Sequence, residues 1–248
     1  MLDALCWRAK LGVLGPSTNT IVQPDFYVLR PPGVTNHYCR IVFEDSCAIS
    51  DESFMAGTLE ISDNTIEAVN GVLTCKPDYL IMGMSAVTFY GGAEGGRRWR
   101  ENVEAAAGLQ LSIGSESIAA ALAAYGSIRK VAVLSPYFPV ANTEVKRFLS
   151  DYGYETVRDE CLRCPSWTAI AEVDEATLED VLRRIDGDDV DAIVQVGTNL
   201  SMLRLAAQTE ARLAKPVIAV NAATYWHALR ANGIDDEVIG CGRLLAEY

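Results

Sequence analysis

The stretch LGVLGPS at residues 11–17 is the most informative part of the sequence, because it recurs as VAVLSPY at residues 131–137. A second pair follows in the same order, with YLIMGMS at 79–85 and AIVQVGT at 192–198. Each phrase is an apolar run that ends at glycine, proline or hydroxyl residues, which is typical of a buried strand whose carboxyl end opens into a polar loop. Two such strands in each half predict a duplicated α/β unit whose loops face each other.

The rest of the chain alternates between patterns of strands and helices, which predicts βαβ units and parallel sheets. We expect strands near 11–15, 78–83, 109–113, 130–134, 191–196 and 216–220. We expect helices near 51–71, 98–107, 115–125, 142–152, 174–186, 199–213 and 222–231, with Ser115, Asn142 and Asp174 as caps. Residues 21–50 are punctuated by proline and glycine and are predicted to be irregular, and the glycine-rich stretch 91–96 is predicted to be a loop.

The predicted fold class is therefore α/β, with two pseudo-symmetric Rossmann-like halves on parallel sheets and the functional site in the cleft between them. Residues 1–114 and 222–248 are assigned to the first half, and residues 115–221 to the second. No linker rich in proline, serine or charge separates the halves. We therefore expect them to share an interface.

Composition excludes several classes of partner. The chain has 248 residues and a formal net charge of −12, which argues against a nucleic-acid partner because such proteins need a basic face. No stretch approaches the roughly 20 apolar residues of a membrane span, and the first residues lack the apolar core of a signal peptide. These features favour a cytoplasmic protein without a membrane partner.

Cysteine usage favours reduced thiols over disulfides or metal sites. The seven cysteines form an odd number, and a cytoplasmic protein of this size is expected to keep them reduced. The CLRC motif at 161–164 is a lone CxxC, and no further ligands stand at the spacing of a zinc site. We therefore predict neither a metal nor a cofactor.

Chemistry is expected at the loops that follow the strands, because ligands of parallel α/β sheets bind at the carboxyl ends of the strands. Four loops qualify, at residues 16–20, 83–90, 136–138 and 197–199. They offer backbone N–H groups and Ser, Thr, Asn and Tyr donors, a set suited to a carboxylate or an enolate. Such residues also serve as helix caps and turns. The duplicated placement favours a ligand for Ser17, Asn19, Ser85, Tyr137 and Thr198.

These loops resemble the aspartate/glutamate/hydantoin racemase superfamily, in its arylmalonate decarboxylase and maleate cis-trans isomerase branch. PSTNT at 16–20 is similar to the isomerases' PSSNT loop, and residues 82–90 are similar to the decarboxylases' MGTSxSFY segment. SPY at 135–137 resembles the strand end that supplies a carboxylate-binding tyrosine. VGTN at 196–199 resembles the SCTN motif, and YWHALR at 225–230 resembles the terminal WHALR helix.

The resemblance breaks at the positions of the family's cysteines. Racemases and isomerases of this kind place one cysteine after the second strand of each half, and decarboxylases keep only the second. Here Gly83 and Gly197 stand at those positions, and Met84 replaces a threonine. Glycine cannot transfer a proton as a tuned thiol does. The resemblance therefore disfavours two-base racemisation and cysteine addition. Glycine at these positions is expected to leave extra room. Cys241 is the one other thiol considered as a proton donor.

We therefore expect a cofactor-free lyase of the decarboxylase kind, acting on a small carboxylate or dicarboxylate through an enolate-like intermediate. Backbone N–H groups and Ser, Thr, Asn and Tyr side chains would hold the intermediate. An isomerase or racemase of the same superfamily is the first alternative. A hydrolase that uses bound water, or a non-catalytic protein that binds a small acid, is the second. The resemblance also allows a homodimer. Tyr137 and Ser85 are the candidate catalytic residues, and the candidate substrate-binding residues are Ser17, Asn19, Gly83, Met84, Gly197, Thr198 and Asn199.

Overall fold

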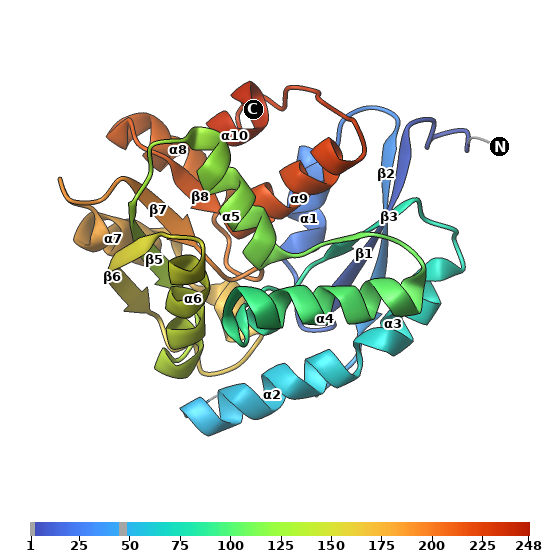
Figure 1. Ribbon diagram of the computed structural model, residues 1–248, viewed down its shortest axis with the longest axis horizontal. Helices are drawn as coiled ribbons and strands as arrows, with labels where there is room; N and C mark the ends of the chain where they lie inside the picture. The colour runs from blue at the N-terminus through green and yellow to red at the C-terminus, as the bar shows by residue number, and fades with distance from the viewer. Residues whose placement is uncertain (1–2, 45–48) are drawn as a thin grey trace.

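Two four-stranded parallel sheets form the frame of the protein, in a computed structural model that describes residues 3–44 and 49–248 (Figure 1). The first sheet has the strand order β2-β1-β3-β4, and the second has the matching order β6-β5-β7-β8. The strands are β1 (Ala9–Pro16), β2 (Val34–Ile41), β3 (Tyr79–Met82), β4 (Leu111–Ser112), β5 (Lys130–Ser135), β6 (Glu155–Cys161), β7 (Ala192–Gln195) and β8 (Val217–Ala219). The matching orders confirm the α/β class and the duplicated halves.

The repeated phrases of the sequence are the central strands of the two sheets. In the first sheet Leu11 of β1 lies opposite Tyr79 of β3, and in the second Val131 of β5 lies opposite Ala192 of β7. These strands are apolar along their length because helices cover both faces of a parallel sheet. Their carboxyl ends reach the same edge in each half, where the polar loops begin.

Ten α-helices and two short 3₁₀ turns connect the strands within the described residues. The helices that precede β5 are α1 (Val22–Leu29), α2 (Asp51–Asp63), α3 (Thr65–Leu73), α4 (Gly92–Ala107) and α5 (Gly114–Tyr125), and the turn η1 is Ala86–Phe89. Those that follow are α6 (Pro139–Asp151), α7 (Glu175–Ile185), α8 (Leu203–Leu213), α9 (Val220–Ala231) and α10 (Arg243–Glu247), with the turn η2 at Ala169–Glu172. No helix of the described ranges is long and apolar enough to cross a membrane.

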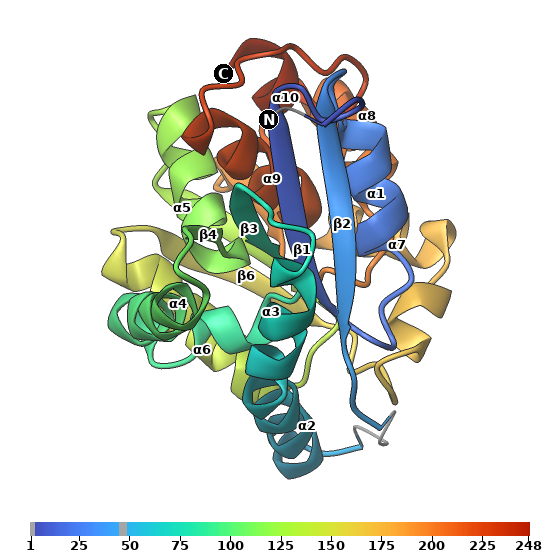
Figure 2. The ribbon, with the colours of Figure 1, turned by 90° about the vertical axis from the view of Figure 1, so that its right-hand side faces the viewer.

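The last long helix, α9, contacts elements of both sheets. It packs on β3, β4 and α1, and it also contacts β8 and α5 (Figure 2). The crossover from β1 to β2 and the crossover from β2 to β3 run in opposite directions across the sheet. Right-handed crossovers in opposite directions place their helices on opposite faces of a sheet. Helix α3, which packs on β1 and β2, therefore lies on the face opposite α1. The assignment of residues 222–248 to the first half stays a prediction.

The expectation that residues 21–50 are irregular was wrong for the described part of that range, which holds α1 and β2. Strand β2 lies at the edge of its sheet and reads VTNHYCRI, with mostly half-buried side chains. An edge strand needs no continuous apolar run, so β2 has no apolar pattern that distinguishes it from the proline-containing segment before it. Residues 45–48 lie outside the described ranges.

The glycine-rich stretch 91–96 was predicted as a loop, but α4 begins at Gly92. Carboxylates of α6 cap this helix: the Gly91 N–H donates to Glu144 at 2.8 Å, and the Ala93 N–H donates to Asp151 at 2.8 Å. Side chains at Gly95 and Gly96 would overlap the carbonyl groups of Tyr90 and Thr88. The glycines therefore serve close packing in a helix that tertiary contacts stabilise.

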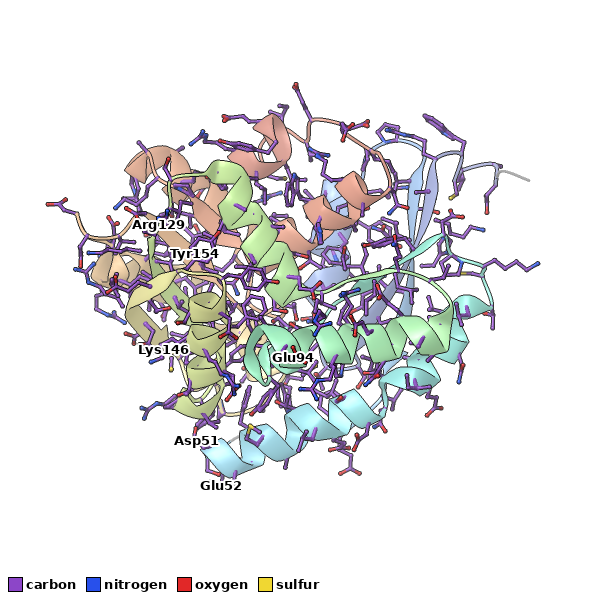
Figure 3. All side chains as sticks on the ribbon, viewed as in Figure 1. Asp51, Glu52, Glu94, Arg129, Lys146 and Tyr154 are labelled. Atoms are coloured by element: carbon purple, nitrogen blue, oxygen red, sulfur yellow. The ribbon has the colours of Figure 1, made fainter. Side chains whose placement is uncertain are left out.

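Some expected helix ends were also shifted. The expected helix 51–71 is two helices that meet at Asn64. Helix α6 begins at Pro139, so Asn142 lies inside it, and the Val140 N–H donates to the Asp51 carboxylate. Asp51 lies at the start of α2 (Figure 3). Ser115 likewise lies inside α5, whereas Asp174 caps α7 through the Thr177 N–H.

Candidate active site

The strand-end loops of the two halves meet around a small, partly open cavity of about 30 Å³, which is room for about two water molecules. All four loops that follow β1, β3, β5 and β7 contribute to it. The lining residues are Pro16, Thr18, Asn19, Met84, Ser85, Ala86, Tyr137, Trp167, Ile170, Gly197, Thr198 and Asn199. No Asp, Glu, Lys, Arg, His or Cys is among them, so any anion here meets neutral donors.

The loops pair crosswise between the halves. The loop after β1 faces the loop after β7, where the Asn19 Nδ2 donates to Thr198 Oγ1 at 3.2 Å. The loop after β3 faces the loop after β5, where Ser85 Oγ and Tyr137 Oη lie 2.6 Å apart. Each contact joins one half to the other, so the cavity exists only where the halves meet.

The pair formed by Ser85 and Tyr137 is almost completely buried, with 1% and 3% of the two residues exposed. Burial raises the pKa of the Tyr137 hydroxyl far above its usual value, and the hydrogen bond with Ser85 only partly opposes this effect. The ring of Tyr137 packs on Phe54 of α2 with centroids 5.3 Å apart. The pair is therefore protonated near neutral pH and fixed in position.

The side chain of Asn19 is occupied within the protein. Its Oδ1 accepts from the N–H groups of Ile21 and Val22 at 3.0 and 2.9 Å, which caps the start of α1. Its Nδ2 reaches Thr198, whose Oγ1 in turn donates to the carbonyl of Gly83 at 2.9 Å. Asn19 thus joins the halves and contributes surface to the cavity.

Asn199 makes the reciprocal connection from the second half. Its Oδ1 accepts from the Thr20 N–H at 2.9 Å, and its Nδ2 donates to the carbonyl of Trp167 at 2.8 Å. These bonds tie the loop after β1 to the segment between β6 and α7. The two asparagines therefore hold the walls of the cavity together.

Backbone N–H groups are the donors that remain available. Among the hydrogen bonds of the described residues, none uses the N–H of Thr18, Ser85, Thr198 or Asn199. All four residues line the cavity. Unpaired amides at turns are suited to bind an anion, and they stand here beside the hydroxyls of Ser85 and Tyr137.

The structure brings seven of the nine candidate residues to the cavity and leaves out Ser17 and Gly83. The Ser17 hydroxyl donates to the carbonyl of Phe43 at 3.3 Å, beside the cavity wall. Gly83 takes part through its carbonyl, which accepts from Thr198. Both residues support the site from behind the lining.

The two glycines at the expected cysteine positions leave no extra room, contrary to the expectation from sequence. A Cβ at Gly197 would lie 2.6 Å from Cγ of Pro136 and closer still to its Cδ. A Cβ at Gly83 would lie 3.0 Å from Cγ1 of Val22 and 3.1 Å from the carbonyl oxygen of Leu14. The Pro136 ring occupies the space of a side chain at 197, and Gly83 is closely packed.

Trp167 and Ile170 were missing from the sequence-based candidates. They come from the segment between β6 and α7, and the ring of Trp167 packs on Phe54 with centroids 5.0 Å apart. Gly57 of α2 leaves the space that this ring occupies, since a Cβ at residue 57 would lie only 2.9 Å from the ring of Trp167. This segment follows the carboxyl end of β6, an edge strand that the sequence pattern did not reveal, so the search of strand ends did not reach it.

The described thiols and histidines lie away from the cavity lining. Six cysteines are described and all are free thiols, whereas Cys47 lies outside the described ranges. Cys241 borders a separate hollow beside Glu210, and burial raises its pKa. His227 contacts the Ser117 hydroxyl at 3.2 Å. Within residues 3–44 and 49–248, no group of three or more His, Cys, Asp or Glu side chains could hold a metal ion.

Known proteins with similar sequences and folds are enzymes that act on small diacids. The chain is 23% identical to the maleate isomerase of Pseudomonas putida over 258 residues, covering 96% of this chain and 97% of that protein. It is 28% identical to the arylmalonate decarboxylase of Bordetella bronchiseptica over 212 residues, covering 79% and 88%.

Solved structures show the same fold. A Nocardia farcinica maleate cis-trans isomerase with a covalently bound succinylcysteine superposes with a TM-score of 0.86 at 20% identity, covering 97% of this chain and 99% of that one. A liganded mutant of arylmalonate decarboxylase gives a TM-score of 0.81 at 21% identity, covering 97% and 100%. The family model of arylmalonate decarboxylase matches residues 50–245, which is more than half of the sequence. The chain therefore belongs to the arylmalonate decarboxylase family.

Proposed function

We propose that this protein is a cofactor-free lyase that removes one carboxyl group from a small malonate-type diacid. The observation that carries the proposal is the hydroxyl pair of Ser85 and Tyr137, 2.6 Å apart in a cavity lined by neutral donors. The family includes decarboxylases, and the cavity supplies what an enolate-like intermediate needs: donors aimed at a growing negative charge.

The diacid binds with its two carboxylates in different surroundings. The retained carboxylate accepts from the unpaired amides and from the hydroxyl pair. The departing carboxylate faces the apolar part of the lining, formed by Met84, Trp167 and Ile170. Removing that carboxylate from water raises its energy relative to neutral CO₂, which favours its loss.

The chemical step balances without a cofactor. The bond between the α-carbon and the departing carboxylate breaks, CO₂ leaves, and the electron pair enters the enediolate of the retained carboxylate. The Tyr137 hydroxyl then gives its proton to the α-carbon, and the resulting phenolate regains a proton from solvent through Ser85. The net reaction consumes one proton and yields a monocarboxylate and CO₂.

Cysteine-based isomerisation fits this cavity less well. The Nocardia farcinica isomerase carries a succinylcysteine, whereas none of the six described cysteines lines the cavity here and Pro136 fills the side-chain space at Gly197. Isomerisation of maleate nevertheless stays the second candidate, because the maleate isomerase of Pseudomonas putida aligns with 96% of the chain.

A diacid needs more space than the roughly 30 Å³ of the cavity, so its lining moves apart on binding. The polar donors stand at strand ends, whereas Trp167 and Ile170 come from the segment between β6 and α7. We place the outward movement in that segment, because it can shift without disturbing either sheet.

The test is incubation of the purified protein with phenylmalonate, methylmalonate and maleate, followed by proton NMR. The proposal expects phenylacetate or propionate to form from the malonates, and maleate to persist. Formation of fumarate from maleate, with no loss of carboxyl groups from the malonates, would replace the proposal with the isomerase. Thermal stabilisation by a malonate without any turnover would support a binding protein instead.

A further inference from the structure

We infer that Arg40 and Asn221 are positioning residues that aim the backbone N–H groups of Thr18 and Asn199 into the cavity. The inference rests on the proposed function, since it assigns the supports of the same anion-binding site. Neither Arg40 nor Asn221 lines the cavity itself. Each acts on a peptide group from the side that faces away from the ligand.

The two amides belong to tight turns on opposite halves. In the first turn the Asn19 N–H donates to the Pro16 carbonyl at 3.0 Å, and in the second the Leu200 N–H donates to the Gly197 carbonyl at 3.0 Å. The central peptide of the first turn joins residues 17 and 18, and that of the second joins residues 198 and 199. Neither Thr18 nor Asn199 has a positive φ, which excludes the type II orientation of the central peptide.

A turn of this kind can reverse its central peptide without moving its ends. Conversion from type I to type II rotates two backbone angles by about 150–170° and exchanges the directions of the central carbonyl and N–H. At either turn the reversed peptide would present a carbonyl oxygen to the cavity and repel a carboxylate. Asparagine tolerates the positive φ that type II requires, so the turn at Asn199 needs support more than the turn at Thr18.

Each central carbonyl is held from outside. Nη1 of Arg40 donates to the carbonyls of Ser17 and Asn19 at 2.9 and 3.1 Å, and its guanidinium lies 5.3 Å from the ring centre of Tyr38. Nδ2 of Asn221 donates to the carbonyl of Thr198 at 3.0 Å. Both peptides are trans, so carbonyl and N–H point in opposite directions. Holding the carbonyl therefore directs the N–H of Thr18 or Asn199 away from Arg40 or Asn221, toward the cavity.

Asn221 is itself fixed in one orientation. Its Nδ2 also donates to the Asp25 carboxylate at 2.8 Å, and its Oδ1 has no hydrogen-bond partner among the described residues. Rotating the amide by 180° would place Oδ1 against two oxygen acceptors. A buried unpaired amide oxygen costs free energy, and the arrangement persists because both donor bonds support it.

The test compares Asn221→Leu and Arg40→Met with two matched controls. Tyr225 lies on the same helix as Asn221, and Tyr225→Phe removes its partly buried hydrogen bond to Asn36 of β2. Arg30→Met removes an arginine that likewise donates to a backbone carbonyl, that of Val34, and stacks on a tyrosine. Malonate is titrated into each ¹⁵N-labelled protein and followed by two-dimensional NMR.

In the unsubstituted protein, malonate is expected to shift the amide signals of both Thr18 and Asn199. Asn221→Leu should raise the Kd for malonate about tenfold or more and abolish the shift of Asn199 while keeping that of Thr18. Arg40→Met should abolish the shift of Thr18, keep that of Asn199 and raise the Kd for malonate by a smaller factor. Arg40→Lys keeps the charge, so full malonate affinity in that variant would overturn the positioning role of Arg40 in favour of charge alone.

If the unsubstituted protein does not bind malonate, the proposed function is wrong for this class of ligand. Residual dipolar couplings of the free proteins then decide the inference. The inference is supported if the N–H vector of Asn199 is reoriented in Asn221→Leu and that of Thr18 is reoriented in Arg40→Met, while both vectors are unchanged in the two controls. Unchanged vectors in both test variants overturn it.

Discussion

The hydroxyl oxygen of Tyr137 lies 2.6 Å from Oγ of Ser85, and this contact joins the carboxyl ends of β5 and β3 in different halves of the molecule. A hydrogen bond this short between buried hydroxyls positions both groups for a shared task. Because neither residue has a charged neighbour in the cavity lining, the pair is a neutral donor set that can pass a proton.

The hydroxyl pair is expected to act as a unit in turnover. Tyr137→Phe should lower kcat by about 10²–10⁴-fold, the range for loss of a general acid, and Ser85→Ala should lower it by a smaller factor. The double variant should be no slower than Tyr137→Phe, since groups that act together are not additive. Steady-state kinetics with phenylmalonate measure this, with Tyr225→Phe as the control. Multiplicative losses in the double variant would show that the two hydroxyls act separately.

Substitution of Gly197 by cysteine is expected to destabilise the fold. The new Cβ overlaps the ring of Pro136, and overpacking of this kind costs about 1–3 kcal/mol. Gly83→Cys should cost less, because its Cβ lies 3.0 Å or more from its neighbours. Urea denaturation measures the free energy of unfolding. Adding Pro136→Ala to Gly197→Cys should restore part of it, and the absence of coupling in this cycle would contradict the packing argument.

Asp25 is expected to make stability depend on pH. Burial raises the pKa of its carboxyl to about 6, although Asn221 donates to it. Since the folded pKa lies above the unfolded value of about 3.9, the protonated form favours folding below pH 4, and this contribution is lost as the pH rises through 6.

Asp25→Asn should therefore raise the free energy of unfolding at pH 8 by about 1–2 kcal/mol, an amount reduced because Asp25 is only partly buried. It should have little effect at pH 4. Urea titrations at the two pH values measure the difference. A variant that is less stable than the unsubstituted protein at pH 8 would show that the charged carboxylate contributes favourably.

Alkylation of the thiols is expected to leave turnover unchanged, because none of the cysteines in the described ranges lines the cavity. Iodoacetamide modifies accessible thiolates, and mass spectrometry identifies which of the cysteines react. A Cys47→Ser variant confines the test to the six described thiols. Loss of activity that a malonate prevents would place a thiol in the reaction and overturn the hydroxyl mechanism.

The sequence revealed the central strands because they are covered on both faces. The apolar phrases at 11–17 and 131–137 are β1 and β5 with the loops that follow them. Of the four edge strands, the fully buried β4 and β8 were found, whereas β2 and β6 were missed because most of their side chains are half-buried, as in the ETVRDEC run of β6. Edge strands have one open side, so the apolar pattern weakens there.

The site was located from strand ends, but its internal bonding could not be predicted. Asn19 and Asn199 read as free donors in the sequence, whereas each is occupied by the opposite half. The position of the Pro136 ring beside Gly197 likewise depends on how two neighbouring loops pack. Such contacts join residues far apart in the chain, and local patterns carry no information on them.

Decarboxylation itself is tested most directly with phenylmalonate labelled with ¹³C in both carboxyl groups. Carbon NMR then follows labelled CO₂ or bicarbonate together with labelled phenylacetate. The unsubstituted protein should release equal amounts of the two products, at a rate that Tyr137→Phe lowers at least about 100-fold. Release no faster than the spontaneous reaction, or an equal rate in Tyr137→Phe, would contradict it.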